Sequence, residues 1–267
     1  MKRFIAQCYI WLLLIVLYAP IVFIAVFSFT ESKVLGNWTG FSTKLYSNLF
    51  TGNMQGTGSL MHAIENTVII ALIAATVSTI LGTIAAIGIH NMRGKTKQAV
   101  TFMNNIPMLN PDIITGVSLF LLFVFLHISQ GYVTVVLAHI TFCTPYVVLS
   151  VLPKLTQMNP NIYVAALDLG ATPFKALRKV LIPLLKPGMI SGFILAFTMS
   201  LDDFAVTFFT RGTIGLDTLS TYIYTDARKG GLTPELRPMI TIMFLGILVL
   251  LIVINLRKIR NTNNPVK

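Results

Sequence analysis

YVAALDLGATPFKALRKVLIPLLKP, residues 163–187, is the stretch that decides the fold, because it is basic and amphipathic in a chain made mainly of apolar runs. We expect a helix over 162–169 that ends at Gly170, since glycine readily adopts the left-handed conformation that closes helices. Thr172 and Pro173 predict the start of a second helix, because a threonine oxygen caps free amides and proline tolerates the first helical position. We call this helix–turn–helix segment, residues 161–187, the elbow.

The second helix of the elbow has an apolar face and a basic face. Apolar residues recur every three or four positions and so share one side of a helix, while basic residues fall largely on the other. Pro183 is expected to end this helix before the next apolar run. The pattern alone suits a protein docking surface and a helix lying on a membrane equally well. The apolar residues are Phe174, Leu177, Val180, Leu181 and Leu184, and the basic ones are Lys175, Arg178 and Lys179.

The residue identities of the elbow resemble the EAA loop of the permease subunits of ATP-binding-cassette (ABC) importers, in which small residues, a glycine and a late proline stand at fixed offsets. The resemblance implies that the elbow contains the coupling helices that fit a groove of a cytoplasmic ATPase. Val164 stands where the family usually carries a glutamate, so the contact would depend on shape and apolar packing. The residues that the resemblance assigns to this contact are Ala165, Ala166, Gly170, Ala171, Phe174, Ile182 and Pro183.

The composition is that of a membrane protein. Of the 267 residues, 55% are hydrophobic and 11% are charged, and the mean hydropathy is +0.78. A soluble protein of this size would need a more charged surface, so we expect most of the exterior to face lipid. The net charge of +11 falls between the apolar runs, which indicates membrane topology rather than nucleic-acid binding. Cys8 and Cys143 have neither metal-ligand spacing nor a disulfide framework.

Six apolar runs predict an all-α membrane protein with six transmembrane helices. The first run is too long for a signal peptide and lacks a small-residue cleavage site near its end, so we expect it to remain as a span. In the second run, Gly82 and Ala86 have the spacing of a close helix contact. Between runs, 30–63 is expected to be an external loop with a short surface helix, and 99–111 a helix broken by Pro107 and Pro111. The runs are residues 9–29, 64–89, 113–128, 132–152, 189–209 and 239–256.

The distribution of lysine and arginine predicts that both termini are cytoplasmic. In that orientation fourteen of the 20 basic residues lie in inner segments and six in outer ones, as the positive-inside rule requires. The elbow is then cytoplasmic, where an ATPase would meet it. The outer residues are Lys33, Lys44, Arg211, Arg228, Lys229 and Arg237, and the inner ones include the cations of the elbow and Lys267.

Asp202 and Asp203 stand well inside the fifth apolar run. An aspartate at the bilayer centre costs about 2.5–3.5 kcal/mol on insertion scales, so two in succession point to an aqueous cavity, a partner or a cation. Adjacent helical residues point about 100° apart, so we expect only one of the two to face a central pathway. The alternative is a structural pair near the outer end of the span, bonded to Arg211 or to a partner subunit. Asp112 and Tyr222 are further candidates for contact with a cationic cargo, with helix capping as the alternative for Asp112.

The sequence offers no constellation for catalysis or metal binding. The histidines are scattered without ligand spacing, and there is neither a nucleophile elbow nor a complete ATP-binding loop. We therefore expect no catalytic residue, no metal and no cofactor in this chain. An ion-driven carrier is an alternative that should show inverted repeats, and a non-transporting scaffold is another that would leave the acidic pair unexplained. The histidines, expected at the interface or satisfied within the bundle, are His62, His90, His127 and His139.

Three further motifs narrow the resemblance to the C-type permeases of spermidine/putrescine importers: NWTGFS at 37–42, NPDIITG at 110–116 and SLDDF at 200–204. The resemblance covers nearly the whole chain, which we treat as a single permease domain, residues 1–267. It implies a complex in the bacterial cytoplasmic membrane with a second permease, two ATPase subunits that bind ATP and Mg²⁺, and an extracytoplasmic substrate-binding protein. The implied cargo is a polyamine, although related permeases for iron, thiamine or other solutes share the fold and the EAA loop.

Overall fold

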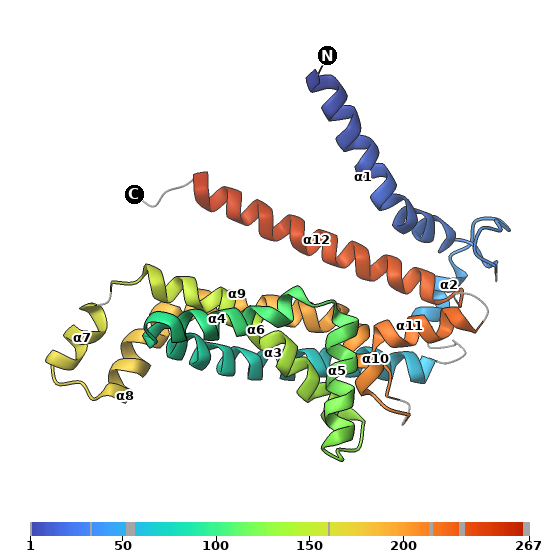
Figure 1. Ribbon diagram of the computed structural model, residues 1–267. Coiled ribbons are helices and arrows are strands. Elements are labelled where there is room, and N and C mark those ends of the chain that lie inside the picture. Colours follow the sequence, from blue (N-terminus) through green and yellow to red (C-terminus); the bar gives the residue numbers. More distant parts are fainter. Residues whose placement is uncertain are drawn as a thin grey trace. The chain divides into compact units, whose positions relative to one another are not determined.

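The structure is a computed structural model that describes residues 2–32, 34–51, 57–159, 161–213, 216–229 and 233–263. Within these residues every regular element is a helix (Figure 1), as expected for an all-α membrane protein. The chain divides into two compact units, which are described separately: Met1–Gly58 with Ile223–Lys267, and Ser59–Tyr222. Lys33 and Lys267, two of the residues on which the predicted orientation depends, lie outside the described residues.

The first unit contains two long helices. α1 (Lys2–Phe27) and α12 (Leu236–Asn263) contact each other, and α12 also contacts the short helix α2 (Lys44–Thr51). α2 confirms the short helix that we expected in the loop after the first apolar run, but the expected end of that loop at residue 63 is wrong, because the next helix begins at Thr57. The division between the units falls within α11 (Leu219–Arg228), whose second half belongs to this first unit.

Aromatic and polar contacts fix the loop that joins α1 to α2. The ring of Phe29 stacks on that of Phe41 at 5.4 Å and lies 5.0 Å from that of Tyr46. Arg237, in the first turn of α12, is fully buried, and its Nη1 donates to the carbonyl of Ser32 at 2.9 Å. The loop is therefore tied both to α2, through Tyr46, and to the start of α12, through Arg237.

The second unit is a bundle whose core lies between α6 and α9, with the elbow helices at one end and α5 and α10 at the other (Figure 1). Its helices, in chain order, are most of α3 (Thr57–Asn91), α4 (Gly94–Leu109), α5 (Asp112–Phe125), α6 (Tyr132–Gln157), α7 (Asn161–Asp168), α8 (Pro173–Ala176), the π-helical turn η1 (Leu177–Leu181), α9 (Ile182–Asp202) and α10 (Ala205–Thr210).

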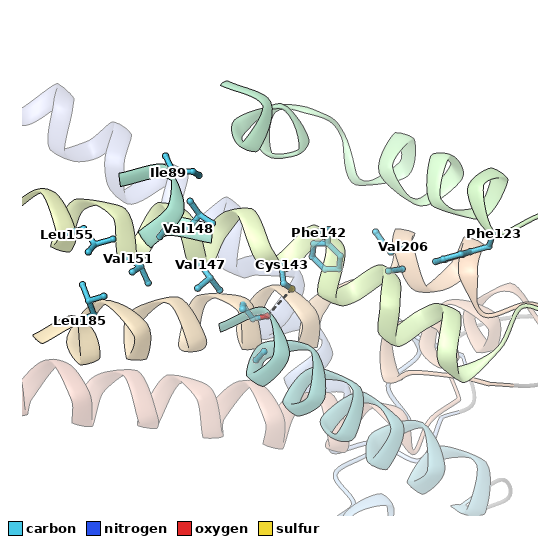
Figure 2. Packing of buried hydrophobic residues seen from close by; sticks show 14 residues of the cluster. Ile89, Phe123, Phe142, Cys143, Val147, Val148, Val151, Leu155, Leu185 and Val206 are labelled. Atoms are coloured by element: carbon cyan, nitrogen blue, oxygen red, sulfur yellow. Dashed lines mark hydrogen bonds between the residues drawn. The ribbon is translucent and has the colours of Figure 1, made fainter. Parts of the chain in front are cut away.

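Glycines allow α3 and α9 to approach α6 closely. A Cβ added to Gly82 of α3 would lie 2.7 Å from the side chain of Val147, and one added to Gly192 of α9 would lie 3.1 Å from it. Ala86 is fully buried one turn after Gly82, so the close helix contact predicted at these two positions is confirmed. Figure 2 shows Val147 in a row of buried apolar side chains on α6, near Cys143, whose thiol donates to a carbonyl of α9 at 3.4 Å. Close packing and internal hydrogen bonds are the forces that hold helices together in lipid.

The elbow is present, but its second helix does not end at Pro183. α8, η1 and α9 form one continuous helical segment, Pro173–Asp202. The expected end at Pro183 is therefore wrong. A proline in a regular helix meets the carbonyl four residues before it, and for Pro183 that residue, Lys179, lies in the wider turn η1, which gives the ring room.

One predicted helix break is confirmed, and one predicted span is broken. α4 runs through Pro107 and ends at Leu109, so of the two expected proline breaks only the one at Pro111 occurs; there α4 and α5 are bent by 107°. The fifth predicted span, 189–209, is not one helix, because α9 ends at Asp202 and α10 begins at Ala205.

Four helical segments of the described residues are long and apolar enough to cross a membrane, and the number is five if the bent pair of α4 and α5 is counted as one span. They are Gln7–Phe27, Gly58–Asn91, Tyr132–Gln157 and Pro173–Asp202. The start of α12 adds a shorter apolar helix, Leu236–Gly246. The chain is thus a helical membrane protein, and the number of six spans and the cytoplasmic placement of both termini stay predictions.

Candidate functional site

A cavity of about 530 Å³ lies where α9 is broken. Three carboxylates, those of Asp112, Asp202 and Asp203, line it, and none of its lining residues is a lysine or an arginine. The structure thus brings together three of the four residues predicted for a cargo path. The rest of the wall is formed by Pro111, Ile113, Phe142, Met199, Phe204 and Ala205.

Asp203 lies at the break and caps the start of α10. Its Oδ1 accepts a hydrogen bond from the amide of Val206 at 3.1 Å, and its Oδ2 accepts from the amide and the hydroxyl of Thr207, both at 2.8 Å. These amides belong to the first turn of α10, where backbone N–H groups have no partner within the helix. The side chain of Asp203 is only 5% exposed, and both its oxygens are engaged by the protein. Asp203 is therefore a structural group in the wall of the cavity.

His139 supports Asp203 from α6. The imidazole is fully buried; hydrogen bonds join its Nδ1 to Ser200 Oγ at 2.6 Å and its Nε2 to Thr207 Oγ1 at 2.9 Å. Nε2 also lies 3.4 Å from Asp203 Oδ2. The expectation that the histidines are satisfied within the bundle is confirmed for His139, which joins the end of α9 to the start of α10.

Asp202 and Asp112 differ from Asp203 in that both are exposed. Asp112 is the first residue of α5, and Pro111 holds the N-cap position, so the capping alternative for Asp112 does not apply. The neighbouring aspartates Asp202 and Asp203 thus have different surroundings, one open and one buried.

Tyr222 and Arg211, the other residues named with the acidic pair, are not among the residues that line the cavity. Phe204 lines the cavity, whereas Tyr222, on α11, is not one of the lining residues. Arg211 Nη1 donates to Asp217 Oδ1. The alternative in which Arg211 pairs with Asp202 or Asp203 is therefore wrong.

The turn of the elbow is closed by two backbone hydrogen bonds, from the amide of Gly170 to the carbonyl of Leu167 at 2.8 Å and from the amide of Ala171 to that of Ala166 at 3.1 Å. Gly170 has a φ of +84°, in the left-handed region, so the predicted glycine-terminated helix is confirmed. Thr172 Oγ1 accepts from the amide of Lys175 at 3.4 Å, which confirms the predicted cap.

The apolar side chains of the elbow point in two directions. Leu177 and Leu181 line a second cavity, of about 560 Å³, together with Tyr163 and Val164 and residues of α3 and α6. Phe174 is 71% exposed and Leu169 is 88% exposed. Two exposed apolar side chains therefore flank the tight turn of the elbow, and we call them the tip; exposed apolar side chains suit contact with another surface.

Three features of these sites were not predicted: the exposure of Leu169, the hydrogen-bond partners of His139, and the pairing of Arg211 with Asp217. Leu169 is apolar and directly precedes a helix-ending glycine, which is a local signal for an exposed position. The partners of His139 lie 61 and 68 residues away along the chain, and no spacing rule connects them.

Comparison with protein families gives one matching family model. Residues 78–259 match the family described as "Binding-protein-dependent transport system inner membrane component". Among curated proteins, the chain is 37% identical to the spermidine/putrescine transport system permease protein PotC of Haemophilus influenzae over 263 residues, which cover 98% of this chain and 99% of that one. It is 38% identical to the putrescine transport system permease protein PotI of Escherichia coli K12 over 234 residues, or 85% and 81% of the two chains.

Among solved structures, the fold resembles a chain of a bacterial ABC transporter involved in the import of the acidic polysaccharide alginate. The TM-score is 0.68 at 14% identity, over 96% of this chain and 95% of that one. A chain of the inward-facing MetNI methionine ABC transporter gives a TM-score of 0.59 at 20% identity, over 77% and 96% of the two chains. At these identities the likeness concerns the fold alone.

Proposed function

This chain belongs to the family of binding-protein-dependent transport system inner membrane components, and from that premise we propose that it is the permease subunit of an ATP-driven importer of the polyamines spermidine and putrescine. The family membership makes it a transport component of the bacterial inner membrane. The cargo is supported by the relatives, which are spermidine/putrescine and putrescine permeases.

The observation that carries the proposed cargo is the acidic cavity at the break of α9. Polyamines are flexible chains with two or more cationic amino groups, and a cavity lined by carboxylates and Phe204 offers charge and an aromatic face to such groups. Asp202 and Asp112 are the exposed carboxylates, so they are the proposed cargo contacts. Asp203 holds the cavity wall in place through α10. Tyr222 is a weaker candidate for contact with the cargo, since it is not among the residues that line this cavity.

The proposed complex contains this permease, a second permease, two ATPase subunits and an extracytoplasmic substrate-binding protein. The elbow, on the cytoplasmic side of six spans, is the proposed contact with the ATPase, in which ATP and Mg²⁺ are bound. Val164 replaces the usual glutamate, so the contact has to rest on apolar side chains. The exposed tip, Leu169 and Phe174, offers two such side chains and therefore supports this contact. ATP binding closes the ATPase dimer and moves the elbow, and the cavity opens alternately to the two sides of the membrane.

Uptake tests the cargo. Vesicles containing the whole co-expressed complex are given labelled spermidine with and without ATP, and the unaltered chain is compared with Asp202→Asn, Asp112→Asn and Tyr222→Phe. We expect ATP-dependent uptake that falls in both aspartate variants, while Tyr222→Phe stays near the unaltered rate. No uptake by an assembled, ATP-hydrolysing complex would refute the polyamine cargo and leave the family unchanged.

The elbow is tested separately, by ATP hydrolysis and uptake in the same vesicles. Gly170→Pro removes the amide that bonds to Leu167 and forces a φ that the turn does not have, and Ala166→Glu places a charge at the turn. Both should reduce uptake more than ATP hydrolysis while the chain still inserts. Lys154→Gln, on α6, is the control and should leave both rates unchanged. Normal uptake in both elbow variants would remove the coupling role.

A further inference from the structure

Arg211 lies in a position that would suit a free organic cation. It caps the end of α10, and its Cζ atom lies 5.3 Å from the centroid of the Phe208 ring. Its Nη1 donates to Asp217 Oδ1. An aromatic face combined with a carboxylate is the arrangement that binds alkylammonium and guanidinium groups.

The groups around this guanidinium are held by contacts that do not involve Arg211. Asp217 Oδ1 also accepts from Thr221 Oγ1 at 3.1 Å, and the carbonyl of Asp217 accepts from Asn66 Nδ2 at 3.1 Å. The ring of Phe208 stacks on that of Phe204 at 5.3 Å. The arrangement of Phe208 and Asp217 is therefore expected to persist when Arg211 is absent or turned away.

Phe208 contacts a residue that lines the acidic cavity. Phe204 lines the cavity and stacks on Phe208 one turn later along α10. A chain-like cation in the cavity would therefore meet Asp202 and Phe204 first, and a second cationic group further along the chain would reach Phe208.

The charge balance favours exchange of one cation for another. The side chains of Arg211 and Asp217 are 19% and 30% exposed, so the guanidinium can turn into water. If a cargo ammonium takes its place, Asp217 keeps a cationic partner, and the penalty of a partly buried, unpaired carboxylate does not arise.

We propose that Phe208 and Asp217 form a second cation site, which Arg211 fills when cargo is absent and which an ammonium group of the cargo takes over during transport. The identity of the cargo as an organic cation rests on the proposed function. Arg211 then acts as a competitor built into the chain. If Arg211 leaves the site empty for only a fraction of the time, the apparent affinity for the cargo equals the intrinsic affinity multiplied by that fraction.

The direction in which KM changes when Arg211 is replaced tests whether Arg211 competes with the cargo. If Arg211 fills the site about 70–90% of the time, Arg211→Ala lowers the KM for labelled spermidine about 3- to 10-fold. Asp217→Asn removes the site itself and raises KM. The control is Arg228→Ala, because Arg228 also lies over an aromatic ring, that of Tyr224 at 5.8 Å, and its removal should leave KM unchanged. If Arg211 were only a structural tie, Arg211→Ala would reduce the rate without lowering KM, and that result would overturn the proposal.

A measurement without cargo separates this inference from the proposed function. Ethylguanidinium should raise the melting temperature of the purified Arg211→Ala complex and have no such effect on the Arg211→Ala/Asp217→Asn double variant. Equal responses of the two would overturn the second site, whether or not the complex carries polyamines. Arg211→Gln is made in parallel, and failure of both Arg211 variants to assemble would show that Arg211 is a structural requirement, which also refutes the proposal. Absence of spermidine uptake by the unaltered complex, with a positive ethylguanidinium result, would reject only the polyamine cargo.

Discussion

Asp203→Asn is expected to destabilise the chain strongly, whereas the same change at the neighbouring Asp202 is not. In Asp203, Oδ2 accepts two hydrogen bonds from Thr207 at 2.8 Å and Oδ1 accepts one from the amide of Val206 at 3.1 Å. Asparagine keeps one acceptor and turns the other into a donor that faces donors. Hydrogen bonds to charged groups contribute about 1.5–3 kcal/mol each, and the amide can rotate to retain the better part of them. We therefore expect a loss of about 2–5 kcal/mol in the free energy of unfolding.

The assay is thermal unfolding of the purified complex in detergent. For chains of this size, 1 kcal/mol corresponds to about 2–4 °C, so Asp203→Asn should lower the melting temperature by roughly 5–15 °C. Asp202→Asn changes an exposed side chain and should stay within about 0.5 kcal/mol of the unaltered chain. Equal shifts in the two variants, or a larger one for Asp202→Asn, would refute the division into a structural and an exposed aspartate.

Three further predictions use the same complex. Gly82→Ala would place a methyl group 2.7 Å from a valine of α6 and should cost about 1–3 kcal/mol in thermal unfolding, whereas Gly88→Ala, with open space on the same helix, should be neutral; equal costs would contradict the close packing. Phe174→Asp should lower the amount of ATPase that copurifies with the permease, because it charges the exposed tip of the elbow, and unchanged copurification would exclude Phe174 from the contact. Arg237→Met removes the buried donor to the carbonyl of Ser32 and should cost about 1–3 kcal/mol, so an unaltered melting temperature would show that the bond contributes nothing.

The elbow could be predicted from the sequence because its signals are local. A glycine that must take positive φ and a threonine that caps the next helix act within a few residues of their own positions. Gly170 and Thr172 accordingly occupy the conformations expected of them. The resemblance to the importer family rests on the same short stretch, so the family and its fold class could both be predicted from the sequence of the elbow.

The continuation of the helix through Pro183 could not be predicted in the same way. The rule that proline ends a helix assumes regular hydrogen bonding in the turn before it. Whether that turn widens into η1 depends on contacts made in the folded bundle, where Leu181 packs against the buried core, and the residues of the elbow do not specify those partners.

The start of a new helix after Asp203 had a signal in the sequence, but the apolar residues around it favoured a continuous span. An aspartate before a helical segment is a common start signal, because its oxygens can accept from free amides. Within 189–209 the surrounding residues are so apolar that one continuous span was the simpler interpretation. The support from His139 was beyond sequence reasoning, since its partners lie on helices that meet only in the folded bundle.

The absence of a break at Pro183 has a mechanical consequence. The segment Pro173–Asp202 has 30 residues, and at 1.5 Å per residue it is a rod of about 45 Å. One end of the rod carries the exposed phenylalanine of the elbow, and the other carries the exposed aspartate of the cavity. A displacement at the first end can reach the second along one continuous helix, and the wider turn η1 and Pro187 are the places where that helix can bend.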